Sequence, residues 1–307
     1  MLVCVQQARA GPHNHRPQSW VPAFAGTTVI AGSQSCPVLL LPADAVATTI
    51  LVFDSGLGGL TVFREVAKAR PDARYLYVAD DAFFPYGGQG EAELVVRVGD
   101  LIGDLIEAHR PDLIVIACNT ASTLVLPHLR TRFRVPFVGT VPAIKPACAV
   151  SRSKRVAVLG TQATVSREYT RALIRDFANG SDVALIGSAR LAGFAEEELN
   201  GAPVADDLIA REIAPCFIDD GGRRTDTIVL ACTHYPLLLD RFERLSPWPV
   251  TFVDPAPAIA RRVADLLGGA AGAEPPAPPR VVFTSGREPS AALGAALARF
   301  GIGGWSN

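Results

Sequence analysis

Short apolar runs alternate with stretches of helical periodicity from Thr49 to the end of the chain. The runs are continuous rather than alternating, which is typical of strands buried on both faces. We predict strands at 50–53, 75–79, 112–117, 137–139, 155–159, 183–186, 226–231, 252–254 and 281–284. We predict helices at 61–70, 91–109, 122–133, 166–178, 204–217, 256–267 and 290–299. The alternation predicts an α/β fold with doubly wound parallel sheets and crossover helices.

The strand and helix pattern starts again at Arg155, which predicts two similar domains with the active site in the cleft between them. We expect 47–141 plus 254–307 to form the first α/β domain and 142–253 the second. Residues 1–46 show no sustained period, and we expect a poorly ordered N-terminal extension there. The stretch 268–279 has the Gly, Ala and Pro content of a linker.

A cysteine follows two of the predicted strands in closely similar surroundings. The segment DLIVIACNT at 112–120 recurs as DTIVLACTH at 226–234, so Cys118 and Cys232 occupy equivalent positions. Chemistry in parallel α/β sheets takes place at the carboxyl ends of strands. A single buried cysteine is usually inert, but two in matching contexts, each followed by polar residues, favour a functional role. Two thiols facing one cleft suit a reaction whose substrate and product are mirror images.

Polar groups near these strand ends are further candidates. The turn DSGLGG at 54–59 lacks the spacing of a dinucleotide fingerprint, and its glycines favour close backbone binding of a carboxylate or amine. Asp54 projects from the strand end, although a helix N-cap is the simpler interpretation. His234 is a candidate helper for Cys232, since only the thiolate is a strong base. Glu196 lies in an acidic cluster that equally fits a solvated helix face.

Composition narrows the class of partner. The formal net charge is −1 with no long run of one sign, so neither a nucleic acid nor an anionic membrane is suggested. A small-molecule substrate fits better. The six cysteines show neither a C-x-x-C pair nor metal-type spacing, and no segment reaches the length of a membrane helix. These features predict a cytoplasmic protein with reduced thiols and no metal site.

Four segments resemble the motifs of glutamate racemases, the cofactor-independent enzymes of bacterial cell-wall precursor synthesis. They are VFDSGLGGL at 52–60, PYG at 85–87, ACNTAS at 117–122 and ACTHYPLL at 231–238. The resemblance covers the chain from about Ile50 to its end, and the two cysteine motifs together are highly specific. It implies two α/β domains related by a pseudo-twofold axis, and conversion between L- and D-glutamate by two thiols without a cofactor. A homodimer is compatible with the resemblance.

The resemblance also implies roles for single residues. Cys118 and Cys232 would be the two acid/base groups, Cys232 acting on L-glutamate and Cys118 on D-glutamate. Asp54 would assist Cys118, and His234 and Glu196 would assist Cys232. Amide and hydroxyl side chains after each cysteine are in themselves suited to holding a carboxylate. The substrate-binding residues implied are Asp54, Ser55, Tyr86, Gly87, Asn119, Thr120, Thr233 and His234.

The sequence departs from the family pattern in places and leaves alternatives open. Ser188 stands where many members have a third cysteine, Ala231 replaces a common glycine, and 88–90 is unusually glycine-rich. A racemase of another amino acid, such as aspartate, is the nearest alternative. A thiol hydrolase would use one dominant cysteine and form an acyl adduct. A ligand-binding protein or a redox-sensing thiol pair would exchange no α-proton.

Overall fold

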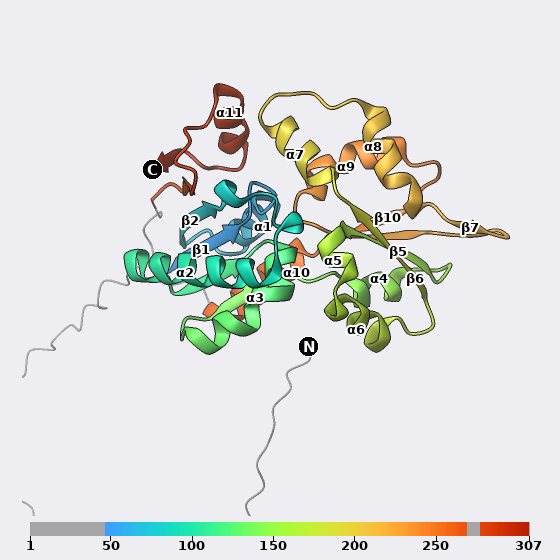
Figure 1. Cartoon of the computed structure of the whole chain (residues 1–307), viewed down its shortest axis with the longest axis horizontal. Coiled ribbons are helices and arrows are strands. Elements are labelled where there is room, and N and C mark those ends of the chain that lie inside the picture. The colour runs from blue at the N-terminus through green and yellow to red at the C-terminus, as the bar shows by residue number, and fades with distance from the viewer. Residues whose placement is uncertain (1–46, 269–276, 307) are drawn as a thin grey trace, which may run out of the picture. The chain divides into compact units, whose positions relative to one another are not determined.

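Two separate parallel sheets organise the chain in the computed structural model, which describes residues 47–268 and 277–306 (Figure 1). The first sheet has the order β12-β11-β2-β1-β3-β4. Its strands are β1 (Thr49–Asp54), β2 (Arg74–Ala79), β3 (Leu113–Ile116), β4 (Phe137–Gly139), β11 (Arg280–Phe283) and β12 (Gly304–Ser306). The second sheet has the order β10-β9-β5-β6. Its strands are β5 (Arg155–Thr161), β6 (Asp182–Ser188), β9 (Thr227–Ala231) and β10 (Thr251–Val253).

Every pairing within these two sheets is parallel, which confirms the predicted α/β fold with parallel sheets. Parallel neighbours need crossover connections, and helices supply most of them. The α-helices are α1 (Leu60–Ala69), α2 (Glu91–His109), α3 (Asn119–Arg132), α4 (Ile144–Val150), α5 (Gln162–Ser166), α6 (Glu168–Phe177), α7 (Leu191–Leu199), α8 (Asp206–Ile213), α9 (Leu239–Leu245), α10 (Ala256–Leu267) and α11 (Ala291–Arg299). Short 3₁₀ turns are η1 (Asp81–Phe83), η2 (Tyr86–Gly88), η3 (Ala214–Cys216) and η4 (Tyr235–Leu238).

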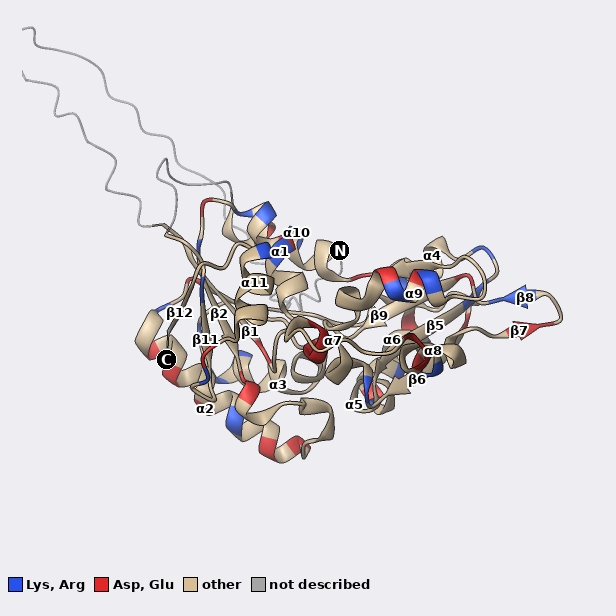
Figure 2. Cartoon of the chain, turned by 90° about the horizontal axis from the view of Figure 1, so that it is seen from above, with Lys and Arg blue, Asp and Glu red and all other residues tan. Residues whose placement is uncertain are grey.

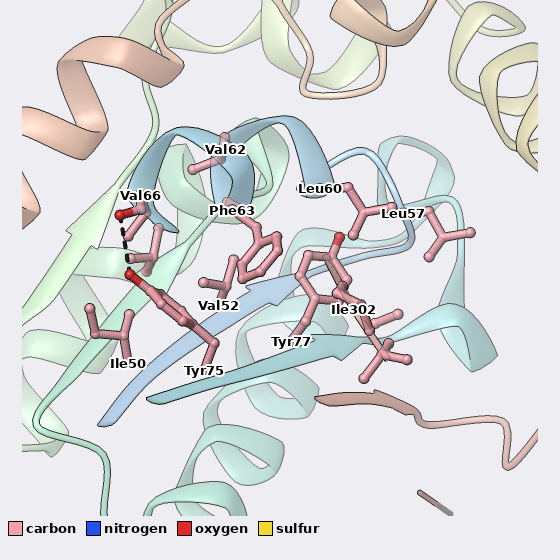
Figure 3. Packing of buried hydrophobic residues seen from close by; sticks show 14 of the residues in the cluster. Ile50, Val52, Leu57, Leu60, Val62, Phe63, Val66, Tyr75, Tyr77 and Ile302 are labelled. Carbon is pink, nitrogen blue, oxygen red and sulfur yellow. Dashed lines mark hydrogen bonds between the residues drawn. The ribbon is translucent and has the colours of Figure 1, made fainter. Parts of the chain in front are cut away.

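Strand β1 is buried on both faces, as its continuous apolar run predicts. Ile50 and Val52 belong to one core cluster with α1 and α10, whereas Leu51 and Phe53 belong to another with α2 and α3. Figure 3 shows the first of these clusters, where the Tyr75 hydroxyl donates to the carbonyl oxygen of Val66 at 3.1 Å. Each fully buried side chain of this size contributes about 1.5–3 kcal/mol. The two clusters fix β1, and with it the position of Asp54 at the strand end.

Helix α3 begins earlier than predicted. It starts at Asn119 rather than near Ser122, because Cys118 itself takes the N-cap position with extended backbone angles. Cysteine is not among the usual N-cap residues, so the sequence carried no start signal there. The residues predicted to form a polar tail after Cys118 are therefore the first turn of a helix.

The second half of the chain contains smaller differences. The helix predicted at 204–217 ends at Ile213, because Pro215 cannot continue it and a 3₁₀ turn follows. An antiparallel hairpin then pairs β7 (Asp219–Asp220) with β8 (Arg223–Arg224), acidic on one strand and basic on the other (Figure 2). Gly221 and Gly222 both have positive φ, 62° and 91°, as its two-residue turn requires.

The predicted domain division remains a prediction. All described residues belong to one compact unit, Asp44–Asn307, and the chain after Val253 returns to the first sheet through α10 and β11. The expected N-terminal extension, 1–46, lies outside the described residues, as does most of the expected linker. No helix within 47–268 or 277–306 is long and apolar enough to cross a membrane.

Candidate active site

The carboxyl ends of central strands from both sheets meet at one small cavity. Strand β1 leads to Ser55, β3 to Cys118, β5 to Thr161 and β9 to Cys232. The cavity measures about 20 Å³, room for about one water molecule. Its lining consists of Ser55, Phe84, Pro85, Tyr86, Gly87, Cys118, Asn119, Thr120, Thr161, Ala192, Cys232, Thr233 and His234. The two thiols predicted from the repeated strand end therefore line the same cavity.

Cys118 is a buried thiol at the start of a helix. Its side chain is the N-cap of α3, and the backbone N–H of Ala121 donates to Sγ at 3.5 Å. Burial, with a smaller contribution from the nearby charge of Asp54, raises the pKa of Cys118 to about 12, although hydrogen bonds from Ser55 and Ala121 act to lower it. At neutral pH this group is a thiol and can donate a proton.

Cys232 has a histidine in contact with its sulfur. The chain turns directly after β9 into η4, which brings Nδ1 of His234 to 3.8 Å from Sγ of Cys232. Nε2 of the same ring lies 2.9 Å from Oε1 of Glu196 and 3.1 Å from the backbone nitrogen of Gly58. Burial lowers the pKa of His234, but the bonds to Cys232 and Glu196 outweigh it and raise that pKa well above its ordinary value. The imidazolium form is thus favoured beside Cys232.

Asp54 is fully buried near the Cys118 thiol and the His234 ring. The N–H of Gly56 donates to its Oδ2 at 3.1 Å, and the Thr233 hydroxyl donates to its Oδ1 at 3.5 Å. Burial raises the pKa of this carboxyl, while the charge of His234 acts in the opposite direction. Asp54 influences the pKa of Cys118 as well. Its charge is therefore coupled to the thiol of the first sheet and to the histidine of the second.

Glu196 is directed inward, unlike its neighbours in the acidic cluster. Glu197 and Glu198 are exposed, whereas Oε1 of Glu196 accepts the N–H of Leu57 at 2.6 Å and contacts His234. The alternative of a solvated helix face fits the exposed Glu197 and is wrong for Glu196, whose side chain is 13% exposed. One carboxylate oxygen ties the glycine-rich turn after β1 to the histidine turn after β9.

The candidate binding residues divide into two groups. Ser55, Gly87, Asn119, Thr120 and Thr233 line the cavity, and both amide atoms of Asn119 are buried without a hydrogen-bond partner among the described residues. A buried amide without hydrogen-bond partners indicates that a ligand binds there, because an unpaired buried polar group costs free energy of folding. The Tyr86 hydroxyl instead donates to the buried carboxylate of Asp80 at 2.5 Å, so only the rest of Tyr86 faces the cavity.

Four lining residues were not among the predicted site residues: Phe84, Pro85, Thr161 and Ala192. Thr161 follows Gly160 at the end of β5, and its hydroxyl lies 3.2 Å from the Thr120 hydroxyl. Its place at a central strand end is the signal that could have identified it. The Phe84 ring packs 5.5 Å from the imidazole of His234, and no motif marks that contact in advance. Within the described ranges, no cluster of three or more His, Cys, Asp or Glu side chains is arranged to hold a metal ion.

Comparison with known proteins gives a consistent result. The Asp/Glu/Hydantoin racemase family model matches residues 58–263. Glutamate racemase of Brucella anthropi is 55% identical over 74% of this chain and 82% of its own length. That of Mesorhizobium japonicum is 51% identical over 82% of this chain and 97% of its own. The structure of Escherichia coli glutamate racemase in complex with L-glutamate and the activator UDP-MurNAc-Ala aligns with a TM-score of 0.78 at 39% identity, covering 85% of this chain and 97% of that one.

Proposed function

Because the chain belongs to the family of Asp/Glu/hydantoin racemases, and is thus an isomerase, we propose that it interconverts L- and D-glutamate by two-base proton exchange without a cofactor. The observation that carries this proposal is the pair Cys118 and Cys232 on one small cavity, each after a central strand of a different sheet. Relatives that are 55% and 52% identical to this chain are named glutamate racemase, which supports glutamate as the substrate.

In the proposed reaction, one thiolate removes the α-proton from one face while the opposing thiol donates a proton to the other. With L-glutamate, Cys232 accepts the proton beside the His234 imidazolium, and Cys118, whose pKa is about 12, is the donor. The roles exchange with D-glutamate. General acid–base groups typically contribute about 10²- to 10⁴-fold each.

The transient carbanion needs stabilisation, because the α-proton of an amino acid beside a carboxylate is a very weak acid. The unpaired amide of Asn119 and the hydroxyls of Thr120 and Thr233 are placed along the cavity to bind the substrate carboxylates. Preorganised donors of this kind are typically worth about 3 kcal/mol in the transition state. A pyridoxal cofactor, the common electron sink for such carbanions, has no part in the proposal.

Substrate entry requires movement around the cavity. An amino acid is several times larger than the single water molecule that about 20 Å³ admits. We therefore infer that the described conformation is the closed one, and that it opens to bind glutamate. Closure around the substrate would exclude water from the carbanion.

The proposed cellular role is the supply of D-glutamate for peptidoglycan precursors in the cytoplasm, by an enzyme that can form a homodimer. Bacterial relatives named glutamate racemase support this role. When this protein is expressed in a bacterial strain depleted of its own glutamate racemase, the strain should grow without added D-glutamate. Failure of a soluble, active enzyme to restore growth would contradict the cellular role and leave the reaction itself intact.

Replacement of each thiol tests the reaction. Cys118→Ser and Cys232→Ser should each almost abolish racemisation, with Cys148→Ser, a buried cysteine outside the cavity, as the control. In deuterated water, we expect each variant to retain α-proton exchange for only one enantiomer. Circular dichroism follows racemisation, and NMR follows the loss of the α-proton signal.

The same assay separates the alternatives. Near-normal racemisation in either cysteine variant would overturn the two-base assignment. Faster turnover of aspartate than of glutamate would point to the neighbouring amino-acid racemase. A covalent acyl adduct on one cysteine, detected by mass spectrometry, would indicate a thiol hydrolase.

A further inference from the structure

A second, larger cavity lies on the other side of the wall formed by Phe84. This outer cavity measures about 310 Å³, and its lining consists of Asp81, Phe84, Glu196, Glu197, Asn200, Ala202 and Arg287. Glu197 and Ala202 are exposed, so the outer cavity reaches the protein surface. Phe84 lines both cavities, and its ring packs against His234 on one side. Catalytic groups and outside solvent are thus separated by little more than one aromatic ring.

One chain of polar contacts crosses this wall. Cys232 Sγ contacts His234 Nδ1 at 3.8 Å, and His234 Nε2 contacts Glu196 Oε1 at 2.9 Å. The His234 side chain is 3% exposed and lines the inner cavity, whereas that of Glu196 is 13% exposed and lines the outer one. The imidazole and the carboxylate together connect a buried thiol to water without opening the inner cavity.

We propose that the Cys232–His234 pair exchanges protons with solvent through Glu196 and the outer cavity, so that Glu196 serves as a proton exit. This inference rests on the proposed two-thiol mechanism. When Cys232 accepts the substrate proton, the thiolate that stabilised the imidazolium is lost. The Nε2–H bond of His234 then breaks, an O–H bond forms on Glu196, and the carboxyl group passes the proton to water. The Sγ–H bond of Cys232 then breaks and the second N–H bond of the ring re-forms, which restores the thiolate and the imidazolium. Over one conversion, Cys118 takes one proton from solvent, so the proton count of the enzyme is restored.

The surrounding charges are compatible with this route. On the inner side, His234 faces Cys232 and Asp54. On the outer side, Asp81 and Arg287 neutralise each other at 2.8 Å, and Glu197 is exposed. Cys118 differs, because Asp54, Ser55 and Ala121 around it are all buried. Its proton exchange must therefore pass through the inner cavity when that cavity opens.

Filling the outer cavity tests the route without changing the catalytic groups. In Ala202→Phe, we expect kcat at saturating glutamate to fall by about tenfold, because proton release follows the chemical step; this is less than the about 10²-fold or more that loss of the proton-transfer group itself would cost. We expect kcat/KM to stay near that of the wild type, since it reports only steps up to the transition state. Ala92→Phe, at an alanine on α2 that is also exposed, is the matched control. Equal kcat in both variants would overturn the route.

Chemical rescue tests Glu196 itself. Glu196→Ala should lose kcat, and formate, small enough to enter the outer cavity, should restore part of it. The double variant Glu196→Ala/Ala202→Phe should not be rescued. Rescue that is unaffected by Ala202→Phe, or wild-type kcat in Glu196→Gln, contradicts the proposal. Loss of activity in Glu196→Gln without any rescue of Glu196→Ala would indicate a structural role only.

The outcomes distinguish this inference from the function on which it rests. If the two-thiol mechanism is wrong, Cys118→Ser or Cys232→Ser retains racemisation. If only the proton route is wrong, both cysteine variants are inactive while Ala202→Phe turns over glutamate at the wild-type rate.

Discussion

At the scale of single residues, burial places the acid and base groups in states that their ordinary chemistry would not give them. Asp54 is the clearest case, because it is fully buried near the Cys118 thiol and His234, with hydrogen bonds from the Gly56 N–H and the Thr233 hydroxyl in compensation. Burial raises the pKa of its carboxyl. The folded protein therefore holds this proton more tightly than the unfolded chain does. Asp54 consequently makes the fold less stable wherever the pH would ionise it.

Asp54→Asn should reveal this cost. Because the pKa of this carboxyl is higher in the folded state, the free energy of unfolding falls as the pH rises from the ordinary pKa of 3.8 towards the folded-state pKa. Asparagine does not ionise, so the variant does not lose this free energy. We expect the variant to equal the wild type in acid and to melt a few degrees higher at neutral pH, with strongly reduced racemisation. Thermal unfolding between pH 3.5 and 8 measures the difference. Asp176→Asn, an exposed site, is the control, and a lower Tm for Asp54→Asn at neutral pH would show this account to be wrong.

At the scale of elements, the turn between β1 and α1 lies directly against the turn after β9. A Cβ atom on Gly58 would lie 2.6 Å from Cγ and 2.7 Å from the backbone nitrogen of His234, closer than real side chains approach. Gly59 is restricted in the same way by Asp54 and Ala117, at 2.8 and 2.9 Å. Gly58 and Gly59 of DSGLGG therefore lack side chains where His234, Asp54 and Ala117 approach the backbone closely.

Gly58→Ala should displace His234 from Cys232 and Glu196 at once. A shift of about 1 Å at a catalytic group costs about 10²-fold in rate, and we expect at least that loss in kcat. Gly88→Ala, where an added Cβ meets no atom within 4 Å, should leave kcat unchanged. Stopped-flow circular dichroism on both variants, with Tm to confirm folding, gives the comparison. Wild-type kcat in Gly58→Ala would mean that His234 is not held by this contact.

The secondary-structure elements could be predicted from the sequence more completely than the contacts within the candidate site. The continuous run before Cys118 and the helical period of 91–109 predict β3 and α2, because the residues that decide them are adjacent in sequence. The inward position of Glu196 depends on a contact with Leu57, 139 residues away, and local composition could not distinguish it from Glu197. The position of Phe84 over His234 has the same origin, since it depends on how the two sheets pack together. The early start of α3 was missed because a cysteine acts as its cap.

At the scale of the whole molecule, the closed cavity is bounded by contacts of unequal strength. On one side, Glu196 accepts the backbone N–H of Leu57 in the turn after β1, and Nε2 of His234 lies 3.1 Å from the backbone nitrogen of Gly58 in the same turn. On the other, Thr120 and Thr161 share one hydroxyl contact, and Glu91 at the start of α2 pairs with Arg167 before α6 at 2.9 Å. The Glu91 side chain is 68% exposed, so this ion pair is the more easily broken contact. Opening should therefore begin on the Glu91–Arg167 side.

Charge reversal at this pair should change access to the cavity. Glu91→Arg and Arg167→Glu alone should speed the alkylation of Cys118 by iodoacetamide a few-fold, since an ion pair with one solvent-exposed partner, here Glu91, contributes about 1 kcal/mol. The double variant restores opposite charges and should return the rate towards the wild type. Glu168→Arg, which breaks the exposed pair with Arg175 on α6, is the control. Mass spectrometry of the Cys118 peptide measures the rate, and equal rates in all variants would exclude this side as the entrance.

The unequal surroundings of the two thiols have a consequence set by thermodynamics alone. A helix N-terminus adjoins one thiol, and a histidine that can gain or lose a proton adjoins the other. Mirror-image amino acids have the same free energy in water, so detailed balance requires equal kcat/KM in both directions at every pH. The asymmetry of the site therefore cannot favour either enantiomer at equilibrium. It can only divide the shared kcat/KM differently between kcat and KM in the two directions, and a titration of His234 that changes kcat/KM must change it equally in both.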